Sequence, residues 1–352
     1  MHAPISPSVA NVVGVGEPQA IIDPLTRAAV FLVATIDEGG EPIVRDLLAD
    51  VAGLERSVGF RLPGTGLTCV TAIGSAAWDR LFSGPKPQEL HVFPEFAGER
   101  HQAPSTPGDL LFHIKAESLD ACFELGTTIA DRLGAAATIV DETMGFRYFE
   151  QRDLLGFVDG TENPTGRGAY SAALVGAEDP EFDGGSYVIV QKYLHDMAAW
   201  KLLTVEEQEM VIGRTKLDDY ELPDTVKPVD SHVARTTVID DNGDERQILR
   251  ANMPFGSIKS GEFGTYFIGY AATPAVTETM LENMFVGSGD VTHDRILDFS
   301  TAVTGTLFFA PAVDFFDALP PPPISATSAV PHIPMTNGSL DIGSLKRSVT
   351  SS

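Results

Sequence analysis

One order of expected elements occurs twice along the chain, and this repetition limits the possible folds more than any other feature. In the first half an apolar strand, a helix and a second strand are predicted at residues 110–114, 118–133 and 137–149. In the second half the same order returns at residues 264–270, 274–285 and 305–309. A further strand and helix precede each set, at 28–36 and 44–57, and at 187–194 and 198–214. Two ferredoxin-like β-α-β-β-α-β halves account for this order and predict an α+β protein.

The length and composition agree with two domains and a tail. At 352 residues, 43% of them apolar, the chain is too long for one ordinary core and suits two domains of about 150 residues each. We expect an N-terminal domain over residues 1–150 and a C-terminal domain over residues 151–318. A run of four prolines starts at Pro320 and precedes small and polar residues, which predicts a disordered tether and tail over residues 319–352.

Charge and cysteine usage argue against several classes of partner. The chain has 24 basic and 49 acidic residues, whereas nucleic acids and anionic membranes are bound by clustered Lys and Arg. The longest apolar run, residues 28–34, is far shorter than a membrane span, and the N-terminus does not have the pattern of a signal peptide. We therefore expect a cytoplasmic protein without nucleic-acid or membrane partners. Cys69 and Cys122 are too far apart in the sequence to suggest a disulfide framework, a zinc site or an iron–sulfur site.

One loop between the two halves is rich in Gly, Asp and Pro and too long for a passive connection. It contains an acidic residue between glycines, in the sequence Gly156-Phe157-Val158-Asp159-Gly160-Thr161-Glu162-Asn163-Pro164. A calcium loop is set aside, because Pro164 stands where the turn glycine belongs and Tyr170 where the bidentate glutamate belongs. From local sequence alone, Asp159 is either a turn or helix cap or a functional carboxylate.

An isolated histidine and a buried arginine are the other candidates. His232 follows a proline-rich segment; imidazole is a common ligand of haem iron, although a lone histidine is more often structural. Arg250 lies in the apolar segment 247–255, and Asn252 faces the same side of a half-buried strand there. Burial of a guanidinium is costly unless an anion meets it. Arg250 therefore indicates either a structural salt bridge or a site where negative charge develops.

Together these residues resemble the dye-decolorizing peroxidases. The segment from Gly156 to Gly160 matches the family's GxxDG signature, and Arg250-x-Asn252 is similar to the B subgroup. The resemblance covers roughly residues 20–316. It implies two ferredoxin-like domains in a dimeric α/β-barrel-like fold with one haem b per subunit. It also implies a peroxidase that reduces hydrogen peroxide and oxidises a reducing substrate, such as dyes, phenolic compounds or metal ions.

The resemblance also assigns roles by position. It implies that His232 ligates the iron and that the distal pocket is formed by Asp159, Arg250 and Asn252. The backbone along the haem edge is expected to be that of Gly160, Thr161 and Glu162. An acidic partner is expected behind His232, and the candidate is Asp294, with Asp298 as the alternative. In this arrangement the carboxylate moves a proton and the guanidinium stabilises developing negative charge.

The end of the chain contains three apolar residues, Leu340, Ile342 and Leu345, in a Gly- and Ser-rich segment. The segment Gly338–Ser348 resembles the cargo-loading peptide that directs proteins into encapsulin shells. This resemblance implies an encapsulin shell protein as partner and, as in encapsulated relatives, a homo-oligomer that is often a hexamer. Two alternatives remain open: a haem-handling, deferrochelatase-like enzyme, and a haem-storing cargo protein in which Asp159 and Arg250 only seat the porphyrin.

Overall fold

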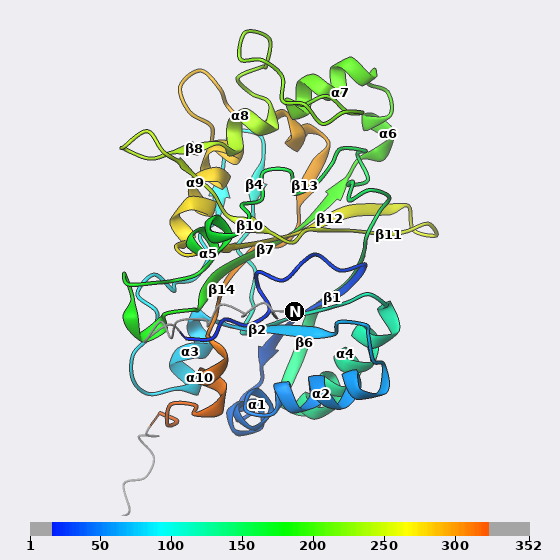
Figure 1. Ribbon diagram of the computed structural model, residues 1–352. Helices are drawn as coiled ribbons and strands as arrows, with labels where there is room; N and C mark the ends of the chain where they lie inside the picture. The colour runs from blue at the N-terminus through cyan, green and yellow to red at the C-terminus, as the bar shows by residue number, and fades with distance from the viewer. Residues whose placement is uncertain (1–15, 324–352) are drawn as a thin grey trace, which may run out of the picture.

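The computed structural model describes residues 16–323 (Figure 1). The predicted targeting segment 338–348 and most of the predicted tether lie outside the described residues. Among residues 16–323, no helix combines the length and the apolar character needed to cross a membrane. Cys69 and Cys122 are both buried and unpaired with each other.

A ten-stranded antiparallel sheet runs through both halves in the order β10-β12-β7-β14-β2-β5-β1-β6, with β11 beside β12 and β13 beside β7. Its first-half strands are β1 (Ala28–Ile36), β2 (Thr68–Gly74), β5 (Leu110–Ala116) and β6 (Ala137–Phe146). Its second-half strands are β7 (Ser186–His195), β10 (Leu249–Arg250), β11 (Met253–Ser257), β12 (Glu262–Ala271), β13 (Ser300–Ala302) and β14 (Thr306–Ala310).

Within each half the four main strands lie in the order fourth, first, third, second, as β6-β1-β5-β2 and as β14-β7-β12-β11. Both halves are therefore ferredoxin-like, and the predicted α+β class is confirmed. The halves join where Phe308 and Phe309 of β14 pair with β2. At the other end β6 approaches β11 so closely that a Cβ on Gly145 would lie 2.4 Å from Met253 Cβ. The sheet consequently curves into a barrel-like body.

Helices cover the outer faces of the sheet (Figure 1). Those of the first half are α1 (Glu41–Leu48), α2 (Val51–Arg61), α3 (Ser75–Leu81) and α4 (Leu119–Leu133). Those of the second half are α5 (Arg167–Ala173), α6 (Met197–Trp200), α7 (Val205–Ile212), α8 (His232–Thr236), α9 (Pro274–Phe285) and α10 (Val313–Asp317). Short pieces complete the chain: β3 (Phe96–Ala97), β4 (Gln102–Ala103), β8 (Val238–Ile239), β9 (Glu245–Arg246), η1 (Gly134–Ala136), η2 (Pro180–Phe182) and η3 (Arg295–Asp298).

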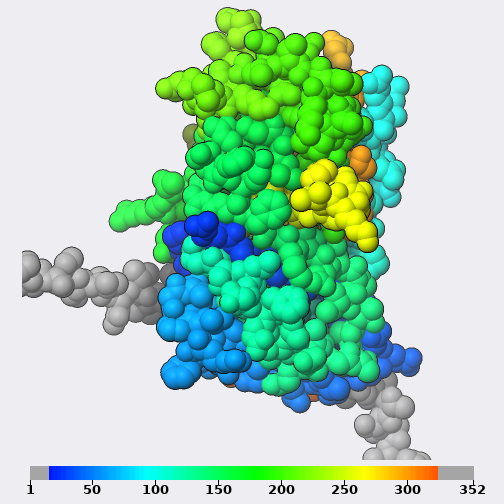
Figure 2. Space-filling view, turned by 90° about the vertical axis from the view of Figure 1, so that its right-hand side faces the viewer, coloured from blue at the N-terminus to red at the C-terminus, as the bar shows by residue number. Residues whose placement is uncertain are grey.

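One interior cluster is formed by alternate strand residues from both halves, among them Phe31, Val188, Ile268 and Phe308. A second cluster fills the space between the sheet and its covering helices, from those of the first half to α9 of the second. Figure 2 shows the resulting single body, with a cyan segment of the first half along the edge of the second. The second half is thereby held at a fixed position on the first.

Three local expectations differ from the structure. The helix predicted over 198–214 is two helices, because Thr204 and Glu207 form a reciprocal capping box that starts α7. The helix predicted over 44–57 breaks between α1 and α2, at Ala49 and Asp50. The half-buried strand expected over 247–255 is interrupted at Ala251 and Asn252, between β10 and β11.

Candidate active site

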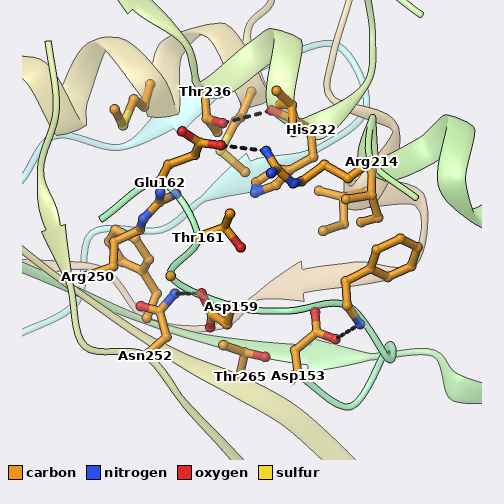
Figure 3. Close-up of a pocket in the computed structure, with 18 of the residues that line it drawn as sticks. Asp153, Asp159, Thr161, Glu162, Arg214, His232, Thr236, Arg250, Asn252 and Thr265 are labelled. Atoms are coloured by element: carbon orange, nitrogen blue, oxygen red, sulfur yellow. Dashed lines mark hydrogen bonds and ion pairs between the residues drawn. The ribbon is translucent and has the colours of Figure 1, made fainter. Parts of the chain in front are cut away.

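A cavity of about 320 Å³ opens in the second half, between the loop 153–162, strands β7 and β12, and helices α8 and α9. Its volume lies in the range of small-molecule and cofactor sites. Among the residues that line it are seven of the predicted site residues: Asp159, Gly160, Thr161, Glu162, His232, Arg250 and Asn252. Figure 3 shows His232 and Asp159 on different sides of this cavity.

His232 is the first residue of α8, and its imidazole is held from behind. Its Nδ1 lies 2.7 Å from Oδ2 of Asp294, whose side chain is fully buried. The other oxygen of Asp294 accepts the backbone N–H of Ile296 at 2.9 Å, which fixes the carboxylate. With Nδ1–H donated to Asp294, the lone pair of Nε2 is left for a ligand in the cavity. The alternative partner, Asp298, lies instead beside His101 and His293.

The side chains of Asp159 and Asn252 are hydrogen-bonded to each other at the cavity wall. Nδ2 of Asn252 donates to Oδ1 of Asp159 at 3.2 Å, while Oδ1 of Asn252 accepts the backbone N–H of Ile268 at 3.1 Å (Figure 3). Gly160 follows with a φ of +81°, a left-handed conformation that favours glycine. The glycine therefore allows the turn that directs Asp159 towards Asn252.

Asn163 holds the same loop against β10. Its Nδ2 donates to the carbonyl of Arg250 at 2.7 Å, and its Oδ1 accepts the backbone N–H of Arg250 at 2.9 Å. Two short hydrogen bonds from one side chain to the backbone N–H and C=O of one strand residue fix the loop relative to the strand. The positions of Asp159 and Arg250 are thus coupled through Asn163.

Arg250 brings an unneutralised positive charge to the cavity. Its Nε is buried without a hydrogen-bond partner, and its guanidinium forms no ion pair with a carboxylate in the part of the chain that the structure describes. The structural salt bridge considered from the sequence is therefore not found among residues 16–323. A buried polar atom without a partner requires an explanation, and an anionic ligand in the cavity provides one.

Asp153 is a cavity residue that the sequence analysis missed. Its Oδ1 accepts the backbone N–H groups of Gly156 and Phe157, at 2.8 and 2.9 Å. Burial raises the pKa of the Asp153 carboxyl to about 7, and the nearby charge of Asp159 acts in the same direction. The D-x-x-G turn from Asp153 to Gly156 can be read from the sequence, but the burial that raises the pKa of the Asp153 carboxyl cannot.

Arg214 is a second missed residue, and it positions the loop by its charge. Its guanidinium pairs with Glu162 through Nη1 and with Asp219 through Nε. Asp219 also accepts the hydroxyl of Thr161. The side chains of Thr161 and Glu162 are thus held by one largely buried arginine, which leaves their backbone along the cavity wall.

These residues fit a haem. A porphyrin requires apolar walls, and the cavity has them from Ile248, Phe267, Met280 and Leu281. The iron requires an axial base, and the imidazole of His232 is the common type of ligand. The Nε of Arg250 is buried without a hydrogen-bond partner, so it would be satisfied by an anionic group bound in the cavity across from His232. The donor set and the walls therefore agree with a haem site.

Comparisons with known proteins agree with this site. The family model described as "Dyp-type peroxidase, N-terminal" matches residues 18–147, and the one described as "Dyp-type peroxidase, C-terminal" matches residues 150–315. A dye-decolorizing peroxidase from Rhodococcus erythropolis is 61% identical over 335 residues, covering 94% of this chain and 97% of that protein.

Solved structures are similar over most of the chain. The encapsulated DyP-type peroxidase from Mycobacterium smegmatis is 63% identical with a TM-score of 0.86, covering 88% of this chain and 100% of that one. DyPB from Rhodococcus jostii is 56% identical with a TM-score of 0.83, covering 86% of this chain and 97% of that one. A variant of the latter protein was solved in complex with heme.

Proposed function

The chain belongs to the family of Dyp-type peroxidases, and from this membership we infer that His232, Asp159, Arg250 and Asn252 perform the peroxidase reaction. The protein is a haem peroxidase. The observation that carries the assignment of residues is that a carboxylate-backed imidazole and an arginine whose buried Nε has no hydrogen-bond partner line one cavity. We also place the domain boundary near residue 150, with the haem held by residues 151–318.

The proposed cofactor site holds one haem b per subunit, with Nε2 of His232 as iron ligand. When bound, the haem supplies a redox-active iron at which peroxide is reduced. The carboxylate of Asp294 accepts the Nδ1–H of His232, so it orients the ring and gives the imidazole more anionic character. The backbone of Gly160, Thr161 and Glu162 is proposed to follow the haem edge.

Asp159 is the proposed proton carrier on the opposite side. Asn252 occupies its Oδ1, which leaves Oδ2 to take a proton from one peroxide oxygen and return it to the other. That second oxygen then leaves as water. Asn252, already fixed by Ile268, is also placed to hold a water that relays the proton.

Arg250 is proposed to stabilise the negative charge that accumulates as the O–O bond breaks. Its charge is not neutralised by a described carboxylate, so its full effect is available in the cavity. Preorganised charges of this kind contribute several kcal/mol to many reactions. The reducing substrate is proposed to be a dye, a phenolic compound or a metal ion.

An absorption spectrum of the purified holoenzyme tests the assignment of function. Stoichiometric hydrogen peroxide should shift the Soret band, and a reducing dye should return it while the dye is bleached with sustained turnover. A haem spectrum that does not respond to peroxide, or a response without turnover, would contradict the proposed peroxidase reaction.

We further propose that the protein is packaged in an encapsulin shell in the cytoplasm, as the M. smegmatis relative is encapsulated. The segment Gly338–Ser348, outside the described residues, is the proposed docking peptide, and a hexamer would present several copies with increased avidity. Deletion of residues 338–352 should abolish co-purification with the shell and leave peroxidase activity unchanged. Packaging by the deletion variant would refute the role of the tail. Mass photometry of the free protein tests the hexamer.

A further inference from the structure

A cluster of two imidazoles and one carboxylate lies outside the haem cavity. His101, His293 and Asp298 each offer one ligand atom, and these atoms all lie within 4.8 Å of one another. Oδ1 of Asp298 is 3.2 Å from Nε2 of His101 and 3.2 Å from Nε2 of His293. None of the three has a role in the peroxidase site described above.

The cluster joins the two halves of the protein. His101 belongs to the turn between β3 and β4 in the first half. In the second half, His293 lies just before η3 and Asp298 is the last residue of η3. Figure 1 shows β4 beside β13, and Figure 2 shows the cyan segment of the first half next to orange residues of the second. The turn is firmly seated, because a Cβ on Gly98 would lie 1.7 Å from the carbonyl oxygen of Phe285. His101 is therefore brought to Asp298 by the packing of the halves.

The distances agree with a metal ion. Zinc binds imidazole nitrogen and carboxylate oxygen at about 2.0–2.2 Å in tetrahedral geometry, which places neighbouring ligand atoms roughly 3.3 Å apart. Both measured separations between Asp298 and the histidines, 3.2 Å, are close to this value. The two imidazole nitrogens are no more than 4.8 Å apart, so this third edge must shorten by up to about 1.5 Å when the ion binds.

The surroundings also suit a metal ligand set. Nδ1 of His293 lies 3.0 Å from the hydroxyl of Thr292, so its Nδ1–H can be donated there while Nε2 presents its lone pair to the cluster. In that tautomer Nε2 and the carboxylate repel unless a cation lies between them. The side chain of Asp298 is 38% exposed, which leaves a path for entry and a position for water. The formal charge of −25 attracts cations to the protein.

We propose that His101, His293 and Asp298 bind a divalent transition-metal ion of the zinc type, separate from the haem iron. Imidazole with one carboxylate suits Zn²⁺ and its neighbours better than Ca²⁺ or Mg²⁺. The ion would tie the first half to the segment between His293 and Asp298. That segment contains Asp294, the partner of His232, so the ion would stiffen the support of the proposed axial ligand.

Calorimetric titration of the chelator-treated holoenzyme with Zn²⁺ tests the proposal. The wild type should bind one Zn²⁺ per chain through this cluster, and its thermal unfolding midpoint should rise. Asp298→Asn, which keeps the shape and the acceptor oxygen of the side chain, should weaken Zn²⁺ binding by at least about tenfold. His101→Gln should weaken it equally and serves as the test if Asp298→Asn folds poorly. The matched control is His91→Gln. Nε2 of His91 also contacts a carboxylate oxygen, at 2.8 Å on Glu278, but His91 is not part of the cluster.

Two results would overturn the proposal. One is a wild type without saturable Zn²⁺ uptake. The other is Zn²⁺ bound with equal affinity by the wild type, Asp298→Asn and His101→Gln, since the ion would then lie elsewhere, for instance among acidic residues of the cavity. The haem spectrum of His101→Gln should still respond to peroxide, because His232 keeps its partner Asp294 in this variant. A failure of the zinc site is therefore distinguishable from a failure of the proposed function.

Discussion

Replacement of Arg250 by an uncharged residue should slow the reaction with peroxide more than Asp159→Ala does. The guanidinium of Arg250 has a buried Nε and no described ion-pair partner, so an effective dielectric constant nearer 20 than 80 applies. At about 4 Å, the attraction for a unit negative charge is then about 4 kcal/mol. Arg250→Gln should therefore reduce the peroxide rate by about 10³-fold.

Asp159→Ala should cost less because another carboxylate remains. General acid–base groups contribute about 10²- to 10⁴-fold. Asp153 lies close enough to Asp159 for their charges to interact, and its raised pKa of about 7 makes it able to exchange protons near neutral pH. With this carboxylate still present, we expect a loss of about 10²-fold, at the lower end of that range.

Stopped-flow measurement of the Soret change against peroxide concentration gives the second-order rate constants. Haem content and the resting spectrum must match between variants. Arg246→Gln is the matched control, because Arg246 lines the same cavity but is exposed and already lies 3.8 Å from Asp240. Its rate should change by less than about threefold, as for other exposed ion pairs. A slower rate for Asp159→Ala than for Arg250→Gln, or an equal loss in Arg246→Gln, would refute the reasoning.

Three further predictions concern stability and loop position. Because burial raises the pKa of Asp153 to about 7, its favourable contribution is present below pH 4 and is lost as the pH rises through 7. Asp153→Asn should therefore raise the free energy of unfolding by up to about 4 kcal/mol at pH 8 but only by about 1.5 kcal/mol at pH 5, and an equal rise at the two pH values would contradict this. Burial lowers the pKa of His195 to about 4, so its contribution is lost as the pH falls from 6.5 through 4, and His195→Gln should flatten the acid side of a plot of unfolding midpoint against pH. Asn163→Ala removes both hydrogen bonds to the backbone of Arg250, so it should lower the free energy of unfolding by about 1–3 kcal/mol and also lower the peroxide rate. An unchanged rate would show that Arg250 is positioned without Asn163.

Local signals in the sequence predicted the elements that carry the site. The strand over 28–36 and the helix over 274–285 have the predicted bounds, because each combines a regular apolar period with clear end signals. The glycine after Asp159 was part of the recognised motif, and its φ of +81° gives the physical reason for it. The capping box of Thr204 and Glu207 is equally readable from the sequence, and it marks a helix start inside the segment 198–214, for which one helix was expected.

Features that depend on packing between distant segments could not be predicted. The choice between Asp294 and Asp298 required coordinates, since both follow His232 at a similar separation along the chain. The strand Thr68–Gly74 was also missed, although it joins the two halves by pairing with β14. Asp153 gains its raised pKa only from burial, and His101 meets His293 and Asp298 only because the halves pack together.

The central claim is that the imidazole of His232, backed by Asp294, is the axial ligand of the haem iron. Resonance Raman spectroscopy of the ferrous holoenzyme measures the iron–imidazole stretching band directly. The band should be present in the wild type, move to lower frequency in Asp294→Asn, and disappear in His232→Gly until free imidazole is added. An unchanged band in His232→Gly would contradict the account, because another residue would then ligate the iron.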